Sequence, residues 1–327
     1  MIAFTVKNIT RNAFVLLLLA VSLPLAQAQN GKWPNKPVRM VVPFPPGGAT
    51  DVVARLMAPH LTEEFGQQFI VDNRPGAGSA IGNEIVVRAN PDGYTILLGN
   101  SSYTSNAALY KLPYDPVNGI SPVALITDGP LIFAVHPSVK AASLKEFIEL
   151  ARAKPNSLNF ATSGTGSLQH LGTELLMQML RTRMVHVPYK GGAPAIIDLI
   201  AGQVQFYLSG PLEILPQVKA GKVRAIAVTS AQRWSLMPEL PAVSEQVPGY
   251  TATPWYAMFA AAGTSRAIIA QLNQAIARIL KKPEVDERLR ATGMEPAHNT
   301  PEQFSQFIAR DLAKWVKVVK AANIKVD

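Results

Sequence analysis

The chain lacks cysteine altogether, which removes several chemistries at once. Without cysteine there is no disulfide, no thiolate metal ligand, no cysteine nucleophile and no lipid-modified cysteine. The five histidines, His60, His136, His170, His186 and His298, do not follow a metal-ligand spacing. The sequence therefore predicts no metal site.

Basic clusters are also missing, although the formal net charge is +9. The longest run of basic residues is the pair Lys281-Lys282, and no basic stripe alternates with aromatic residues. A positive balance attracts anions in general, but this pattern favours solvated positive surfaces. We expect no nucleic-acid partner.

Long apolar runs are absent beyond the amino-terminal segment. Residues 13–25 form an apolar run behind Lys7 and Arg11, and the small-residue site Ala26-Gln27-Ala28 follows it. The run is shorter than the roughly 20 residues of a membrane-spanning helix. We interpret residues 1–28 as a cleaved signal peptide; a retained anchor is the alternative. Residues 1–28 contain two cations and no acid, so residues 29–327 would be an exported, soluble protein of net charge +7.

The remaining sequence alternates short β-like runs with helical patterns, and 48% of all residues are hydrophobic. This alternation predicts an α/β fold, and a length of 327 residues suggests two domains. We expect the chain to cross between domains at residues 127–130 and to return through an irregular, proline-rich stretch at residues 237–253. We also expect a polar loop at residues 99–102 and a helix that begins at Pro194. Further helices are predicted at residues 168–180, 283–291 and 301–322, the last with Thr300 as its N-cap, Pro301 as its first residue and Gln303 completing a capping box.

Three times, an apolar strand is followed by a glycine-rich loop and a helix start. The loops cover residues 44–51, 163–170 and 189–194. Such loops lie at the carboxyl ends of strands, where open α/β sheets bind ligands. Glycine allows close approach of the backbone, and the first helical N–H groups favour an anion. The pattern predicts a site for a carboxylate or phosphate; glycine serving turn geometry alone is the alternative.

Cofactor and enzyme motifs are not fulfilled. No loop has the P-loop pattern, and Gly76-Ala77-Gly78 with Gly82 departs from the dinucleotide fingerprint, so we expect no cofactor. G-x-S-x-G and H-E-x-x-H are absent. Ser167 and His170 lie three residues apart at a helix start, but the sequence shows no third, orienting group. We expect no catalytic residue; an exported hydrolase that uses Ser167 and His170 is the alternative.

The charges within the three loops are few. Lys190 is their only cation, so a carboxylate there would depend on backbone N–H and hydroxyl donors rather than on an arginine fork. Asp51 is their only acid and can simply favour its helix start. If Asp51 faces the ligand instead, it would repel a second carboxylate and attract an amino group.

Seven segments resemble the Bug-type solute receptors of tripartite tricarboxylate transporters. They cover residues 33–39, 43–51, 73–78, 91–95, 161–171, 187–195 and 221–230. The resemblance implies a type II periplasmic binding protein with two α/β domains, a hinge and a ligand cleft. Ala242 and Ser265 depart from residues common in the family, but both lie outside the three loops.

The sequence pattern and the resemblance together give the expected domain limits, site and partners. We expect domain 1 at residues 29–128 and 255–327 and domain 2 at residues 129–254. The expected ligand is a small organic carboxylate, delivered in the periplasm to membrane components of the transporter by a monomeric receptor; a ligand sensor on the same fold is an alternative. Ser101 and Ser209 follow predicted strands, and we expect residues at these positions to influence which acid binds. The predicted ligand-binding residues are Phe44, Gly47, Gly48, Ala49, Thr50, Asp51, Ser101, Ser163, Thr165, Gly166, Ser167, His170, Tyr189, Lys190, Gly191, Gly192, Ala193 and Ser209.

Overall fold

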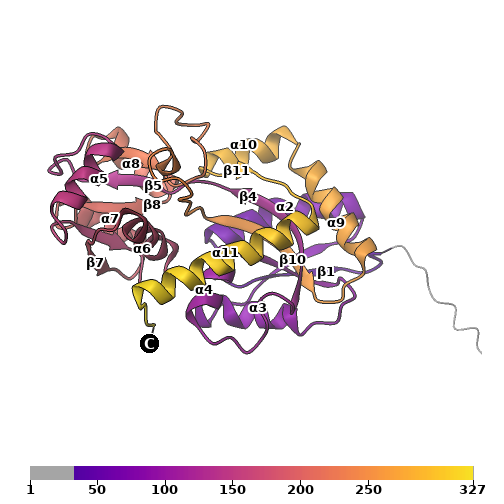
Figure 1. The fold of residues 1–327 in the computed structure, drawn as a ribbon. Helices are drawn as coiled ribbons and strands as arrows, with labels where there is room; N and C mark the ends of the chain where they lie inside the picture. Colours follow the sequence, from indigo (N-terminus) through magenta and orange to yellow (C-terminus); the bar gives the residue numbers. More distant parts are fainter. Residues whose placement is uncertain (1–32, 327) are drawn as a thin grey trace, which may run out of the picture. The chain divides into compact units, whose positions relative to one another are not determined.

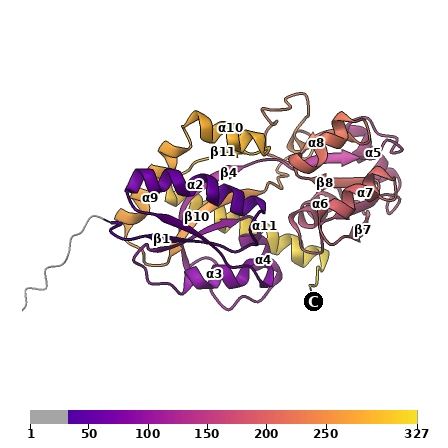
Figure 2. The same cartoon turned by 180° about the vertical axis from the view of Figure 1, so that it is seen from behind.

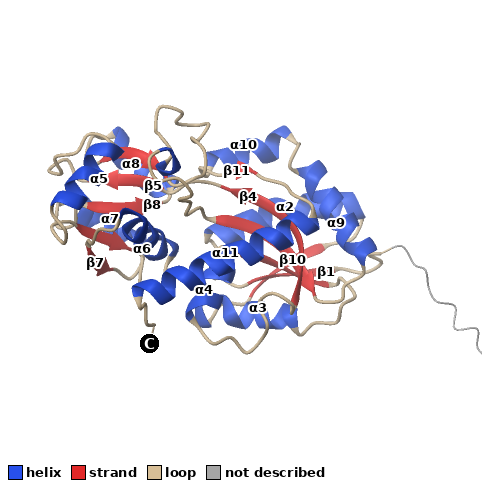
Figure 3. Ribbon diagram, in the orientation of Figure 1, coloured by secondary structure: helices blue, strands red, loops and turns tan. Residues whose placement is uncertain are grey.

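The computed structural model describes residues 33–326, so the predicted signal peptide at residues 1–28 lies outside the described residues. Residues 36–327 cluster as one compact unit that contains two β-sheets. Helices flank the strands of both sheets (Figure 3). The predicted α/β class is therefore confirmed.

The first sheet has six strands in the order β11-β4-β10-β3-β1-β2. Strands β1 (Val38–Val42), β2 (Phe69–Asn73) and β3 (Thr95–Asn100) are parallel, and Val38 pairs with Phe69. Strand β10 (Trp255–Ala261) runs antiparallel between β3 and β4 (Ile120–Asp128), and the short β11 (Glu295–Pro296) lies at the edge. All seven residues of β10 are buried, which is typical of a strand covered on both faces.

The second sheet has five strands in the order β7-β6-β8-β5-β9. Strand β6 (Asn159–Thr162) is parallel to β7 (Val185–Pro188) and β8 (Phe206–Ser209). Strand β5 (Ile132–Val135) is antiparallel to β8 and to β9 (Arg224–Val228). The chain leaves the first sheet after Asp128 and returns to it at Trp255, which gives two crossings. The domain limits given above stay a proposal.

The helices follow local signals in most places. Helix α6 (Leu168–Leu180), α10 (Pro283–Ala291) and α11 (Pro301–Ala322) have the predicted bounds. The remaining helical segments are α2 (Ala49–Phe65), η1 (Ala77–Ser79), α3 (Ala80–Val87), α4 (Ser102–Leu109), α5 (Leu144–Ala153), α7 (Gly192–Ile200), α8 (Pro211–Lys219), η2 (Val243–Glu245) and α9 (Arg266–Ile279). No helix among the residues described here is both long and apolar enough to cross a membrane.

Helix α11 packs against elements of both sheets. Phe304 and Ile308, in its first half, join the core around Trp255 and Phe259 of the first sheet. Trp315, further along, belongs to the core cluster of the second sheet, which also contains Val318. Figures 1 and 2 show α11 passing β10 and α4 and ending beside α6.

Several expectations about elements were wrong. The polar loop expected at residues 99–102 contains the end of β3 and the start of α4, because Gly99 and Asn100 pair with β10. Helix α7 begins at Gly192 rather than Pro194. Thr127 and Asp128, expected at a break, continue β4 because they pair with Trp255 and Tyr256. Helix α8 and strand β10 were not anticipated at all.

Candidate functional site

The first loop joins β1 to α2 and is held by a buried acid. Residues 45–49 are exposed, whereas Asp51 is only 3% exposed. Its carboxylate accepts hydrogen bonds from the Gly47 N–H (2.9 Å), the Arg55 Nε–H (2.8 Å) and the Asn73 side-chain amide (3.0 Å). Burial raises the pKa of Asp51, but these hydrogen bonds outweigh it and bring the pKa to about 2. Asp51 is thus an ionised, paired residue that fixes the loop.

The same loop ends in backbone donors that the described residues leave without an acceptor. Helix α2 begins after Gly48, which provides no side-chain cap. Among the described residues, no acceptor lies opposite the N–H groups of Ala49 and Thr50, as is usual for a first helical turn. The Phe44 carbonyl accepts from Asn73 (3.0 Å), so the loop is held at both ends while its middle stays accessible.

Asn100 joins the first loop to the end of β3. Its side-chain N–H donates to the Thr50 hydroxyl (2.9 Å), and its side-chain oxygen accepts from the Ser102 N–H (2.9 Å) and hydroxyl (2.7 Å). Thr50 and the predicted Ser101 are both buried. Sequence reasoning missed Asn100 because it was assigned to a loop, although its position at a strand end was a usable signal.

The second loop joins β6 to α6. Thr165 is exposed, and Ser163 and Ser167 are partly exposed. Ser167 is the N-cap of α6, and its hydroxyl accepts from the His170 N–H (3.3 Å). Gly166 is buried with a φ of +80°, and a Cβ there would lie 2.7 Å from the Leu109 Cδ1 of α4. Glycine is therefore required at this position by both conformation and space.

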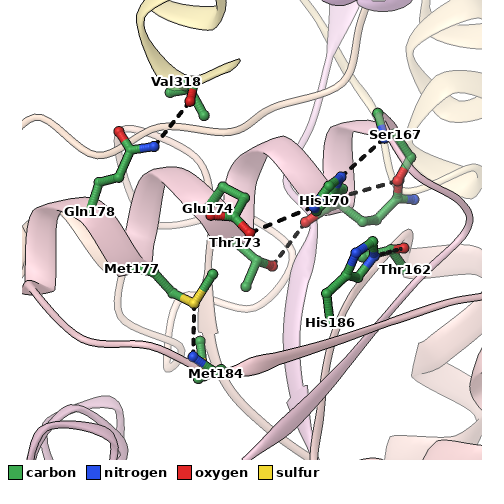
Figure 4. Close-up of polar contacts among 12 residues, drawn as sticks. Thr162, Ser167, His170, Thr173, Glu174, Met177, Gln178, Met184, His186 and Val318 are labelled. Atoms are coloured by element: carbon green, nitrogen blue, oxygen red, sulfur yellow. Dashed lines mark hydrogen bonds and ion pairs between the residues drawn. The ribbon is translucent and has the colours of Figure 1, made fainter. Parts of the chain in front are cut away.

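His170 is a structural residue of this loop. It is 4% exposed; its Nδ1 accepts from the Gly166 N–H (3.0 Å), and its Nε2 lies 3.6 Å from the Glu174 carboxylate. Its ring stacks on the ring of His186, with 3.9 Å between the ring centroids. The pKa of His186 is lowered to about 4 by burial and by the neighbouring His170. The two ring nitrogens of His170 thus face Gly166 and Glu174, and Figure 4 shows the contact with Glu174.

The third loop joins β7 to α7 and lies against the second loop. The Tyr189 N–H donates to the Thr162 carbonyl (3.0 Å), and the Gly191 N–H donates to the Ser163 carbonyl (3.1 Å). The Tyr189 hydroxyl donates to Asp198 (2.6 Å), and burial with this bond raises the pKa of Tyr189 to about 12. The remaining predicted residues are partly or fully exposed: Lys190, Gly191, Gly192 and Ala193. The structure thus brings the second and third loops together.

One acid beside the third loop was missed. Glu213, in the first turn of α8, has its carboxylate against Gly192, and the buried Ser209 hydroxyl donates to it at 3.5 Å. Sequence reasoning did not predict α8, so Glu213 had no assigned position. Pro216 lies within α8, and because an internal proline disfavours a helix, the sequence of this segment does not indicate one.

Two surface cavities lie away from the three loops. One, of about 430 Å³, is lined by charged side chains that include Lys36, Arg39 and Arg88. The other, of about 620 Å³, is lined by residues of α8 and α10 and by Trp234. Within the described residues, no group of three or more histidines, aspartates and glutamates could hold a metal ion. The three loops remain the candidate site because first-turn N–H groups, partly exposed hydroxyls and glycine-rich backbone occur together there.

The comparisons with known proteins agree on one family. The model for the tripartite tricarboxylate transporter family receptor matches residues 53–324. Protein BugT of Bordetella pertussis is 35% identical over 324 residues, which cover 98% of this chain and 99% of BugT. The chain therefore belongs to the tripartite tricarboxylate transporter receptors, and the resemblance to Bug-type proteins is confirmed.

Solved structures give the same fold. Rpa4515 of R. palustris, solved with adipate, has a TM-score of 0.74 and 36% identity over 90% of this chain and 99% of that chain. MatC from Rhodopseudomonas palustris, solved with bound malate, has a TM-score of 0.70 and 31% identity over 88% of this chain and all of that chain. The predicted two-domain solute-binding fold is confirmed.

Proposed function

We propose that this protein is a periplasmic receptor that binds a small organic carboxylate at the three glycine-rich loops. The observation that carries the proposal is the start of α2, where the exposed Ala49 and the buried Thr50 have first-turn N–H groups without an acceptor among the described residues. These donors carry partial positive charge and suit a carboxylate. Relatives solved with adipate and malate bind acids of this class.

Selectivity for the acid would come from the surroundings of those donors. The loops provide exposed hydroxyl and amine donors at Thr165 and Lys190, and partly exposed amides at Gly191 and Gly192. The predicted hinge would let one domain close over a ligand bound to the other, driven by extra contacts in the closed state. The liganded form would be recognised by membrane components of a tripartite tricarboxylate transporter.

The proposal needs no covalent chemistry. A Ser–His hydrolase requires a histidine nitrogen hydrogen-bonded to the serine hydroxyl. Here the two ring nitrogens of His170 face Gly166 and Glu174, and Ser167 caps α6. This geometry supports a binding role for the second loop over the hydrolase alternative.

A thermal-shift screen tests the proposal directly. The purified protein is screened against mono-, di- and tricarboxylic acids and amino acids, and bound acid is recovered for mass spectrometry. We expect one class of acid to raise the melting temperature, since a ligand that binds only the native state stabilises it by mass action, and to be recovered unchanged. Turnover of the acid, lost on Ser167→Ala, would instead support the hydrolase; no response to any acid would contradict a carboxylate receptor.

The Gly48→Val variant locates the site. Gly48 has a φ of −75°, and a Cβ there would have only the Pro45 oxygen within 4 Å, at 3.7 Å, so valine is compatible with the fold. Its side chain would obstruct the approach of a ligand to the start of α2. We expect at least tenfold weaker binding in a folded protein whose melting temperature without ligand is only slightly lowered, because valine is a poorer N-cap residue than glycine. Ala153→Val, at an exposed position of α5, is the control; equal affinity in both variants would contradict this site.

A further inference from the structure

The Glu213 side chain extends from α8 to the start of α7, where its carboxylate lies against Gly192. A Cβ atom on Gly192 would lie 2.6 Å from the Glu213 Oε2 and 3.3 Å from its Oε1. Atoms do not approach that closely, so the carboxylate occupies space that any other residue at position 192 would fill. Glu213 is in the first turn of α8, where an acid is favoured by the helix dipole, but that preference does not explain contact with α7.

The charge of Glu213 has no cationic partner among the residues that the structure describes. None of their ion pairs involves this carboxylate, and the hydrogen bond that it accepts comes from the Ser209 hydroxyl at 3.5 Å. The residue is exposed. A solvent-accessible acid without a counter-ion is available to a cationic group of a ligand.

The charge also acts on the first sheet. Burial, with the Glu213 charge as the second cause, raises the pKa of Tyr256 in β10 to about 12. Tyr256 pairs with Asn100, and Asn100 donates to Thr50 of the first loop. Glu213 thus lies against the start of α7 and also affects the pKa of one residue of β10.

We propose that Glu213 makes this site select carboxylates that carry an ammonium group. The inference rests on the proposed function and names its ligand class. The first-turn N–H groups of α2 would hold the ligand carboxylate, and the ammonium would pair with Glu213 near Gly192. A second carboxylate at that position would meet a like charge, which disfavours plain dicarboxylates.

Matched acids separate the effect of the amino group from the effect of chain length. Titration calorimetry on the purified full chain compares aspartate with succinate and 2-aminoadipate with adipate. We expect the amino acid of the preferred length to bind at least tenfold more tightly than its plain counterpart. Glu213→Gln keeps the size of the side chain and removes its charge, so we expect it to reduce this preference at least tenfold.

Two further variants control the result. Glu149→Gln makes the same charge change at an exposed position of α5 and should leave the preference unchanged. Gly192→Ala should reduce the preference too, because the added methyl group displaces the flexible Glu213 side chain while the backbone φ of residue 192 suits alanine. Circular dichroism establishes that each variant is folded.

The outcomes distinguish this inference from the proposed function. If the protein binds carboxylates but Glu213→Gln leaves the preference within twofold, or the wild-type protein prefers the plain acids, the role of Glu213 is overturned while the receptor function stands. If neither these four acids nor the wider panel bind, the receptor function itself fails.

Discussion

For single residues, the presence or absence of a paired charge distinguishes acids that stabilise the protein from acids that can bind a ligand. Asp51 accepts three hydrogen bonds from its own loop and its neighbours, whereas Glu213 has only a distant hydroxyl donor in the described part of the chain. The sequence predicted Asp51 as a site acid because it stands in a glycine-rich loop. The structure shows that its negative charge is balanced by Arg55, so Asp51 would shape the site rather than select the ligand.

The pairing of Asp51 predicts a pH-dependent contribution to stability. The pKa of Asp51 is about 2 in the folded protein, below its ordinary value of 3.8. Its contribution is therefore complete above about pH 4 and is lost as the pH falls towards 2. We expect Asp51→Asn to lower the free energy of unfolding by about 2 kcal/mol at pH 7 and by less than about 0.5 kcal/mol at pH 2.

Urea denaturation at a series of pH values measures this difference. Glu149→Gln, at an exposed position, provides the comparison and should show no such dependence. A constant difference between wild type and Asp51→Asn from pH 7 to pH 2 would mean that the ionised form is not what stabilises the loop.

At the scale of elements, helix boundaries follow capping signals where these are local. Thr300 was predicted as the N-cap of α11, with Pro301 and Gln303 completing the signature. In the structure, the Thr300 hydroxyl accepts from the Gln303 N–H (3.2 Å), and the Gln303 side chain accepts from the Thr300 N–H (3.0 Å). The prediction is confirmed because every partner lies within three residues.

Removal of this cap should weaken α11 without changing the fold. We expect Thr300→Ala to lower the free energy of unfolding by about 1 kcal/mol, since the first-turn N–H of Gln303 loses its side-chain acceptor. Thr300→Ser keeps the hydroxyl and should stay within about 0.5 kcal/mol of wild type. Equal unfolding midpoints in urea for Thr300→Ala and Thr300→Ser would contradict a role for the hydroxyl.

Elements that depend on distant partners were the ones missed. Strand β10 is a run of seven buried residues, and its assignment depends on pairing with β3 and β4, which precede it by more than a hundred residues. Helix α4 is rich in serine and asparagine, which have weak helix propensity. Its formation is explained by packing against α11 rather than by its own sequence.

At the scale of the whole molecule, Asp311 of α11 joins elements that surround the return crossing. Its carboxylate accepts from the Thr104 hydroxyl of α4 (2.6 Å) and the Trp255 indole N–H of β10 (3.3 Å). Lys314 lies 2.8 Å from the same carboxylate and also donates to the Thr251 carbonyl (3.3 Å). One buried acid thus satisfies donors from three elements.

Loss of Asp311 should therefore destabilise the protein strongly. We expect Asp311→Ala to lower the free energy of unfolding by about 3 kcal/mol, because it removes the acceptor of the buried Trp255 indole N–H, the counter-ion of Lys314 and one hydrogen bond of Thr104. Asp286→Ala breaks a more exposed ion pair with Arg290 and should cost less than about 1 kcal/mol. Chemical denaturation measures both; similar losses would mean that Asp311 acts only as a surface charge.

Local sequence signals were sufficient to predict the α/β class, the three strand–loop–helix units and most helix ends, because periodicity, caps and glycine conformations act over a few residues. The sequence also carried the family resemblance. The packing of separate elements was needed to show that Asp51 is ion-paired with Arg55 and hydrogen-bonded by Asn73, that His170 is held by Gly166 and Glu174, and that Glu213 faces Gly192. Asn73 is about twenty residues from Asp51 in the sequence, and Glu213 is about as far from Gly192. These contacts form when separate elements pack together, so a pattern within a few residues cannot predict them.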